Sequence, residues 1–260
     1  MTPLLRQVLN LLMLVAVLAV NGMAGAGTIS GESIGLIANR YTSFFLPANY
    51  VFGIWSLIYL GLTAFALFQA LPARRGSPVL ERLGSRWLVN GLLNMAWVVL
   101  FSFSLFGLAL VVMLALLWSL IGLTEAIRGD RGPETWGERA LISWVFDLYL
   151  AWISVAVIAN TFQYMTYLEW GGWGISGETW SAVMMVVATA LGAFMVFHRG
   201  NWIFPPVVAW ALWGIRDRFL DVPVLATTAL AMIPAGLMAL VVGLWWRSMR
   251  EADAGGPDGG

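Results

Sequence analysis

Eight long apolar segments recur along the chain, and they constrain its fold more than any other feature. They cover residues 8–26, 50–71, 87–103, 108–127, 141–164, 180–197, 202–215 and 222–246. A helix of about 20 apolar residues crosses the roughly 30 Å hydrocarbon core of a bilayer. Because lipid offers no hydrogen-bond partners, backbone groups must be satisfied within each segment. The pattern predicts an all-α fold, a polytopic integral membrane helical bundle.

Composition agrees with lipid as the main solvent. Of 260 residues, 60% are hydrophobic and 11% are charged, and the mean hydropathy is +0.81. So few charges cannot cover a globular surface. The formal net charge is zero and lysine is absent, so no broad basic face is available and no nucleic-acid partner is expected. Without cysteine, and with His198 as the single histidine, no disulfide, thiolate chemistry or metal cluster is expected.

The number of spans depends on the short segment 202–215, which begins near Pro205 and Pro206. Prolines are tolerated in the first turn of a helix, so this segment can still be helical. Eight spans are favoured and seven remain open. The first segment, 8–26, also resembles a signal peptide because small residues follow it. Its length favours a first membrane helix.

Arginine placement predicts the orientation. With the N-terminus on one side of the membrane, eleven arginines fall on that side and three on the other, for either seven or eight spans. Basic residues accumulate in cytoplasmic loops, so the N-terminus is expected to be cytoplasmic. The expected location is a bacterial cell membrane, crossed several times.

The loops are of two kinds. "PARRGSPVLERLGSR" and "RGDRGPETWGER" are charged and are interpreted as solvated cytoplasmic connectors. On the opposite side, "GTISGESIGLIANRYTSFFLP" and "MTYLEWGGWGISGETW" are rich in glycine and aromatic residues. Such loops either cover the mouth of the bundle or form the aromatic belt at the membrane interface.

Polar and aromatic side chains lie at helical spacing within the spans. Asn94 and Trp97 are three residues apart, and Tyr149 and Trp152 repeat this spacing in a later span that also holds Asn160. Buried amides need partners in lipid, so these asparagines are expected to face the bundle interior. Two interpretations stay open: tight helix packing, or a dry cavity for a flat, mostly apolar ligand.

Asp147 is a carboxylate within a predicted span. Its place in the first two turns favours a side chain that extends to the interface over a functional carboxylate.

Three collinear blocks carry a family resemblance. "LPANYVFGIWSLIYLGL", at residues 46–62, is similar to the second helix of the tryptophan-rich sensory protein / translocator protein family (TspO/MBR). "LLNMAWVVLFSF" and "LYLAWISVAVIAN" are similar to two later helices of that family. Departures include Tyr50 where the family usually has Trp, Ile54 in place of the signature proline, and Leu148 before Tyr149.

The resemblance implies a five-helix bundle that often forms a homodimer. Its cavity would bind a tetrapyrrole such as protoporphyrin or haem, or a sterol, and no cofactor would be required. The ligand-binding residues expected from the matching blocks are Tyr50, Trp55, Asn94, Trp97, Tyr149, Trp152, Ala156 and Asn160.

The predicted organisation has three parts. Residues 1–165 form the TspO/MBR-like five-helix unit, residues 166–250 a transmembrane extension, and residues 251–260 a disordered tail. The leading hypothesis is a translocator or sensor-type protein whose partners are membrane lipid and a hydrophobic small-molecule ligand. The alternative is a secondary transporter for a small solute that uses Asp147 and a broken helix near Pro205 and Pro206. A filled bundle with a structural or assembly role is a third hypothesis. No enzyme is expected, because no acid–base pair or nucleophile is visible.

Overall fold

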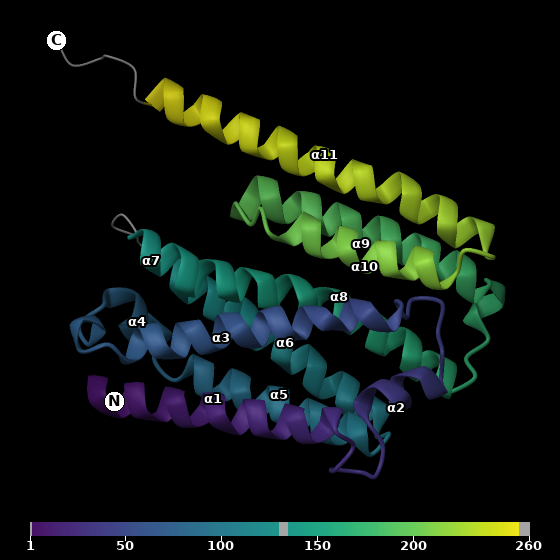
Figure 1. The fold of residues 1–260 in the computed structure, drawn as a ribbon. Coiled ribbons are helices and arrows are strands. Elements are labelled where there is room, and N and C mark those ends of the chain that lie inside the picture. Colours follow the sequence, from purple (N-terminus) through teal and green to yellow (C-terminus); the bar gives the residue numbers. More distant parts are fainter. Residues whose placement is uncertain (1, 130–134, 255–260) are drawn as a thin grey trace. The chain divides into compact units, whose positions relative to one another are not determined.

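A computed structural model describes residues 2–129 and 135–254, and every regular element in these ranges is a helix (Figure 1). The chain divides into two compact units, Met1–Trp170 and Gly171–Gly260. We refer to them as unit 1 and unit 2. Each of the eight predicted apolar segments overlaps a helix of at least 15 residues, which confirms the predicted fold class.

Unit 1 is a closed ring of five long helices. These are α1 (Pro3–Gly25), α3 (Ile54–Ala70), α5 (Arg86–Ser102), α6 (Phe106–Arg128) and α8 (Trp144–Tyr167). Helix α1 packs on α3 and α5, α5 packs on α6, α6 packs on α8, and α8 returns to α3. The shorter elements are α2 (Ile34–Arg40), η1 (Asn49–Gly53), η2 (Pro72–Arg74), α4 (Pro78–Leu83), α7 (Trp136–Glu138) and η3 (Arg139–Ser143).

The interior of the ring is partly aromatic and partly polar. Phe65, Trp87 and Phe146 form a triangle of edge-to-face rings, with centroids 5.0 to 5.9 Å apart, that joins α3, α5 and α8. Gln7 Nε2 donates to the Gln69 backbone oxygen at 2.7 Å, and Gln69 Nε2 donates to the Gln7 backbone oxygen at 3.2 Å. These reciprocal bonds connect α1 to α3 where lipid offers no alternative partner.

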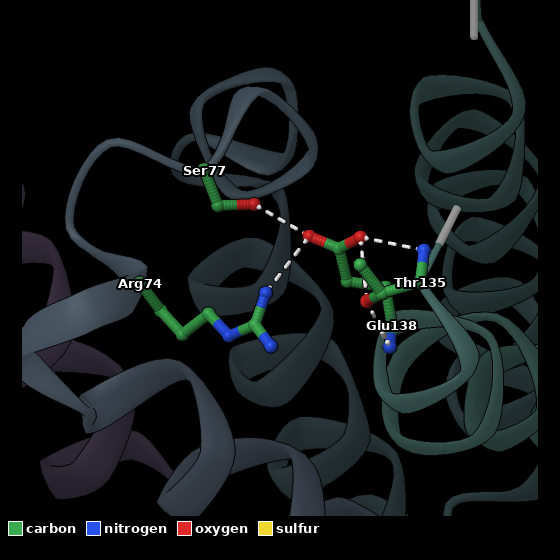
Figure 2. Close-up of polar contacts among 4 residues, drawn as sticks. All are labelled: Arg74, Ser77, Thr135 and Glu138. Carbon is green, nitrogen blue, oxygen red and sulfur yellow. Dashed lines mark hydrogen bonds and ion pairs between the residues drawn. The ribbon is translucent and has the colours of Figure 1, made fainter. Parts of the chain in front are cut away.

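The two charged loops of unit 1 are connected to each other (Figure 2). The Glu138 carboxylate accepts hydrogen bonds from Arg74 Nη1 at 3.4 Å and Ser77 Oγ at 3.3 Å. Its other oxygen accepts from the Thr135 backbone, and the Thr135 hydroxyl in turn caps α7. The two loops are therefore joined through Glu138, and their interpretation as solvated cytoplasmic connectors stays a prediction. Residues 130–134 of the second loop lie outside the described residues.

Unit 2 contains three long helices that alternate in direction along the chain and pack on one another, preceded by the short turn η4 (Gly172–Gly174). They are α9 (Gly177–Arg199), α10 (Phe204–Arg218) and α11 (Pro223–Ala254). Pro205 and Pro206 lie in the first turn of α10, as the sequence suggested, and the Asn201 side chain accepts from the backbone N–H of Ile203 and Phe204 there. Because α11 extends to Ala254, the tail predicted to be disordered begins within a helix, and residues 255–260 lie outside the described residues.

Six helical segments among the described residues are long and apolar enough to cross a membrane. They are Pro3–Gly25, Asn49–Ala70, Phe106–Arg128, Trp136–Tyr167, Gly177–Arg199 and Pro223–Arg250. The other two predicted spans correspond to α5, with 17 residues, and α10, with 15. At about 1.5 Å per residue they measure about 26 Å and 23 Å, less than the hydrocarbon core. The count of eight spans stays a prediction.

Candidate functional site

Unit 1 contains a partly open cavity of about 370 Å³ between α3, α5, α8 and the segment that includes α2. Small-molecule sites in proteins have volumes of roughly 300 to 1,000 Å³, so this cavity lies at the lower end of that range. Its lining is mainly apolar and aromatic, with a few amide and indole groups. This is the usual chemical character of a site for a small organic ligand.

Three tryptophans from three helices form the aromatic wall of the cavity. The ring of Trp55 on α3 stacks on Trp97 of α5, with centroids 6.1 Å apart and planes 21° apart, and meets Trp152 of α8 edge to face at 6.3 Å. Tyr59, one turn beyond Trp55, also stacks on the Trp55 ring, with centroids 5.4 Å apart. Each ring is therefore held by other rings, which fixes its orientation before any ligand arrives.

The polar groups of the cavity are of two kinds. Trp97 Nε1 donates to Asn160 Oδ1 at 3.1 Å, and Asn160 Nδ2 donates to the Ala156 backbone oxygen at 2.9 Å. Trp152 differs: its side chain is 2% exposed, yet its indole N–H has no hydrogen-bond partner among the described residues. A buried donor without a partner costs about 1 to 3 kcal/mol. The Trp152 N–H is therefore an unpaired donor beside the cavity, although its nitrogen atom is itself buried.

Residues of the first long loop cover the cavity. Helix α2 lies at the end of unit 1 where α1 ends (Figure 1), and Ile34, Leu36 and Asn39 contribute to the cavity lining. The loop turns at Gly27, which has φ of +76°; a Cβ there would lie 2.9 Å from the backbone carbon of Glu32. Only glycine fits this turn. The loop therefore folds over the bundle mouth, one of the two interpretations that the sequence left open.

The covering segment is attached by hydrogen bonds and ring contacts. Asn39 Nδ2 donates to Asn49 Oδ1 at 2.9 Å, and Gln163 Nε2 donates to the Ile37 backbone oxygen at 3.4 Å. Tyr41, just after α2, packs edge to face against Phe106 and Tyr167 at 5.6 and 5.2 Å. These contacts join the covering segment to η1, α6 and α8, and the buried side chains of Ile37, Phe45 and Leu46 add apolar packing.

The predicted ligand-binding residues separate into those that line the cavity and those that do not. Trp55, Trp97, Trp152, Ala156 and Asn160 line it. The other three do not belong to its lining: Tyr50, Asn94 and Tyr149.

Asn94 and Tyr149 form a hydrogen-bond network away from the cavity lining, and Tyr50 is 46% exposed. Asn94 Oδ1 accepts from Asn21 Nδ2 and Asn94 Nδ2 donates to the Tyr149 hydroxyl, both at 2.8 Å. Trp55 packs against the Tyr149 ring with centroids 6.0 Å apart. The network joins α1, α5 and α8, so it supports the aromatic wall rather than forming its surface.

Sequence reasoning missed several residues of the cavity. Phe52, Pro47 and Phe101 belong to the blocks that carry the family resemblance, so their positions offered a usable signal. Asn39 and Gln163 offered none, because one lies in a loop without a motif and the other lies beyond the last matching block.

Asp147 lies elsewhere in unit 1 and is engaged. Its carboxylate pairs with Arg128 Nη2 at 2.5 Å, and the residue is 8% exposed. The last turn of α6 brings a guanidinium to the Asp147 carboxylate, and the expectation that Asp147 extends to the interface stays a prediction. In unit 2, His198 is exposed and stacks on Phe194 at 4.5 Å, and the two prolines begin α10 without breaking it. These positions give the transporter alternative no shared site within either unit.

The helical bundle and its long apolar helices define an integral, multi-pass membrane protein. Within that class, a family model described as TSPO-like protein matches residues 7–243, and the chain belongs to this family. The family indicates a membrane protein of the sensor or translocator type. The match extends well beyond residue 165, where the motif resemblance ended, and includes most of unit 2. No match was found among curated proteins or solved structures.

Proposed function

We propose that the protein is a translocator or sensor that binds a hydrophobic ring ligand in the cavity of unit 1. The ligand class is a tetrapyrrole such as protoporphyrin or haem, or a sterol-like molecule. The observation that carries the proposal is the packing of Trp55 against both Trp97 and Trp152, together with one buried indole N–H that has no partner in the described part of the chain. The action is binding or translocation, without catalysis.

The two features of the site suit two parts of such a ligand. The faces and edges of Trp55, Trp97 and Trp152 offer stacking and edge-to-face contacts to a flat ring system. The Trp152 N–H offers one hydrogen bond to an acceptor on the ligand, such as a carboxylate of a tetrapyrrole or the hydroxyl of a sterol. A ligand with both parts removes the penalty of the unpaired donor and gains ring contact area.

Haem would be held by its ring system rather than by its iron. The residues that line the cavity, as the structure describes it, include no His, Cys, Met or Tyr. These are the side chains that coordinate haem iron. The proposal therefore favours metal-free protoporphyrin as a probe and expects haem to bind without an axial ligand from this cavity.

Entry of a large ring would involve movement of the covering segment. The cavity is small for a tetrapyrrole, and α2 with the preceding Ser33 contributes about a third of the lining residues. Movement of this segment would break the hydrogen bonds of Asn39 and Gln163 and would expose the buried side chains of Ile37 and Phe45, while the ring of long helices stays folded. Binding is expected to be slower than diffusion for this reason.

The orientation and assembly that we propose follow the sequence. The N-terminus would be cytoplasmic in a bacterial cell membrane, because eleven arginines fall on that side and three on the other. A homodimer is proposed on the family resemblance. Cross-linking of the protein in membranes and accessibility of labelled termini test these two statements.

Titration of the purified protein with protoporphyrin tests the proposal. The readout is the Soret absorption of the porphyrin, so that replacing a tryptophan does not change the signal. Saturable binding at micromolar porphyrin is expected. Trp152→Phe keeps a ring and removes the N–H, so it should weaken binding about 2- to 10-fold, the value of one neutral hydrogen bond.

The matched control is Trp118→Phe, because Trp118 on α6 is 78% exposed and lies outside the cavity. The affinity of the Trp118→Phe variant for protoporphyrin should equal that of the unchanged protein. Absence of saturable binding for both protoporphyrin and a sterol, or an equal loss in the two variants, would overturn the proposal.

A further inference from the structure

The cavity of unit 1 lies near one end of that unit. Figure 1 shows the N-terminus, α4 and α7 at one end of unit 1, which we call the N-terminal end, and α2 at the other, the α2 end. On α3, α5 and α8 the lining residues nearest the N-terminal end are Trp55, Trp97 and Trp152. Helix α3 continues from Trp55 to Ala70, about 22 Å at 1.5 Å per residue, so a long part of the ring lies beneath the cavity.

Helices α3 and α8 approach each other closely beneath the cavity. A Cβ at Gly61 would lie 3.2 Å from both methyl carbons of Val145, so the missing side chain lets the two helices touch there. Toward the α2 end the same helices are bridged by the rings of Trp55 and Trp152, which meet edge to face with centroids 6.3 Å apart. The pair is therefore closed beneath the cavity and wider at its level.

Fully buried aromatic rings fill the ring of helices beneath the cavity. Phe65, Trp87 and Phe146 are each at most 1% exposed, and their edge-to-face contacts join α3, α5 and α8. Leu62, on α3 between this triangle and Trp55, is equally buried. Protein interiors packed in this way have few voids larger than a water molecule. The layer therefore separates the cavity from the N-terminal end.

Polar side chains hold neighbouring helices together around this layer. The reciprocal bonds of Gln7 and Gln69 join α1 to α3, and both side chains are buried. Asn90 Nδ2 donates to Ser119 Oγ at 2.8 Å and joins α5 to α6. Because lipid offers no replacement partners, each bond resists separation of its two helices.

Two ion pairs add further connections toward the N-terminal end. The pair of Arg128 with Asp147 joins the last turn of α6 to the first turn of α8. The pair of Arg74 with Glu138 joins the turn after α3 to α7 (Figure 2). Together with the aromatic layer, these contacts connect the helices of unit 1 more tightly beneath the cavity than at its level.

We propose that the cavity exchanges its ligand at the α2 end alone, so that unit 1 acts as a receptor for one side of the membrane and not as a passage across it. The identity of the ligand rests on the proposed function, whereas the direction of access does not. Passage through the ring would have to separate the aromatic triangle and the polar contacts around it. Transporters that expose a site to both sides typically form it from discontinuous helices. Helices α1, α3, α5 and α6 pass the level of the triangle without a break.

The accessibility of single cysteines tests this inference without a ligand. The chain contains no cysteine, so each variant carries one thiol. Ala159→Cys places it in the cavity lining, whereas Ala26→Cys and Ala73→Cys mark the α2 end and the N-terminal end at exposed positions. Sealed membrane vesicles of each orientation are treated from outside with a charged, impermeant methanethiosulfonate reagent.

Ala159→Cys should react from the side that modifies Ala26→Cys. Its reaction from the side that modifies Ala73→Cys should be about 100-fold slower or more, because it must wait for the ring to open. Ala66→Cys is the control within the barrier, since Ala66 on α3 is 0% exposed and lies beside Phe65, and its thiol should stay unmodified from the N-terminal side.

The result that would overturn the inference is a comparable rate for Ala159→Cys from both sides, or modification of Ala66→Cys from the N-terminal side. Ala159→Cys that reacts from neither side would refute access at the α2 end as well. Protoporphyrin added to the same vesicles should protect Ala159→Cys. One-sided reaction without that protection would support the inference and count against the proposed ligand, so the two failures are distinguishable.

Discussion

Replacing Asn94 should destabilise the protein while leaving the ligand site nearly unchanged. The structure places this residue away from the cavity lining, in a network that joins three helices. Asn94→Leu is the informative change, because leucine has a similar volume and no polar atoms. It removes the bonds to Asn21 and Tyr149 without creating a large cavity.

The expected magnitude follows from the two lost bonds. Hydrogen bonds between membrane helices contribute about 0.6 kcal/mol on average and about 1.7 kcal/mol at most. Asn94→Leu should therefore lower the free energy of unfolding by about 1 to 3 kcal/mol. Asn21 keeps its bond to the Val17 backbone oxygen, whereas the buried Tyr149 hydroxyl loses its bond to Asn94.

A double variant tests the reasoning about Tyr149. Tyr149→Phe alone should cost about as much as one interhelical bond. Once Asn94 is leucine, the same change removes a hydroxyl without its partner, so its additional cost should be close to zero or favourable. The double variant should therefore be more stable than the sum of the single effects predicts.

The assay is reversible unfolding in mixed detergent micelles, followed by circular dichroism, with protoporphyrin affinity measured in parallel. Affinity should stay within about twofold for the single and double variants, because the residues do not line the cavity. If Asn94→Leu instead lowers affinity tenfold or more with unchanged stability, Asn94 contacts the ligand, and its assignment to a supporting network is refuted.

Two further predictions concern helix packing and the covering segment. Gly61→Val should destabilise the protein by about 1 to 3 kcal/mol, because a Cβ at Gly61 would already lie 3.2 Å from both methyl carbons of Val145. Gly122→Val is the control, since a Cβ at that position meets nothing within 4 Å. Equal unfolding free energies for the two variants would contradict the prediction. Asn39→Cys with Asn49→Cys, linked by a bifunctional thiol reagent, should slow both association and release of protoporphyrin, because the link fixes the segment that carries α2 over the cavity. The chain has no other cysteine, so the reagent links only this pair. Rates equal to those of the unlinked double variant would show that ligands enter elsewhere.

Several outcomes show how far local patterns extend. Pro205 and Pro206 lie in the first turn of α10, where the sequence allowed them, because the missing N–H groups have no intrahelical partner there. Ile54 begins α3 at the position where the family has its signature proline. A first-turn position accepts either residue, which explains why this departure leaves the helix unchanged.

Other outcomes required the assembled bundle. The sequence treated Asn94 and Asn160 alike, yet Asn160 lines the cavity and Asn94 lies in the supporting network. Helical spacing identifies which residues share a face but not how deep a neighbouring helix lies against it. The pairing of Asp147 with Arg128 is similar, because the two residues belong to different helices and meet only when α6 packs on α8.

The sequence by itself determined that lipid surrounds much of the chain, where the helices lie, and which aromatic and amide residues share a helix face. The helices follow because burial in lipid leaves the backbone one way to satisfy its hydrogen bonds. The tertiary structure alone decided that the loop with α2 covers the cavity, that Trp152 keeps an unpaired N–H, and that buried rings and polar pairs close unit 1 beneath the cavity. Each of these depends on contacts between residues far apart in the chain, and no local periodicity encodes them.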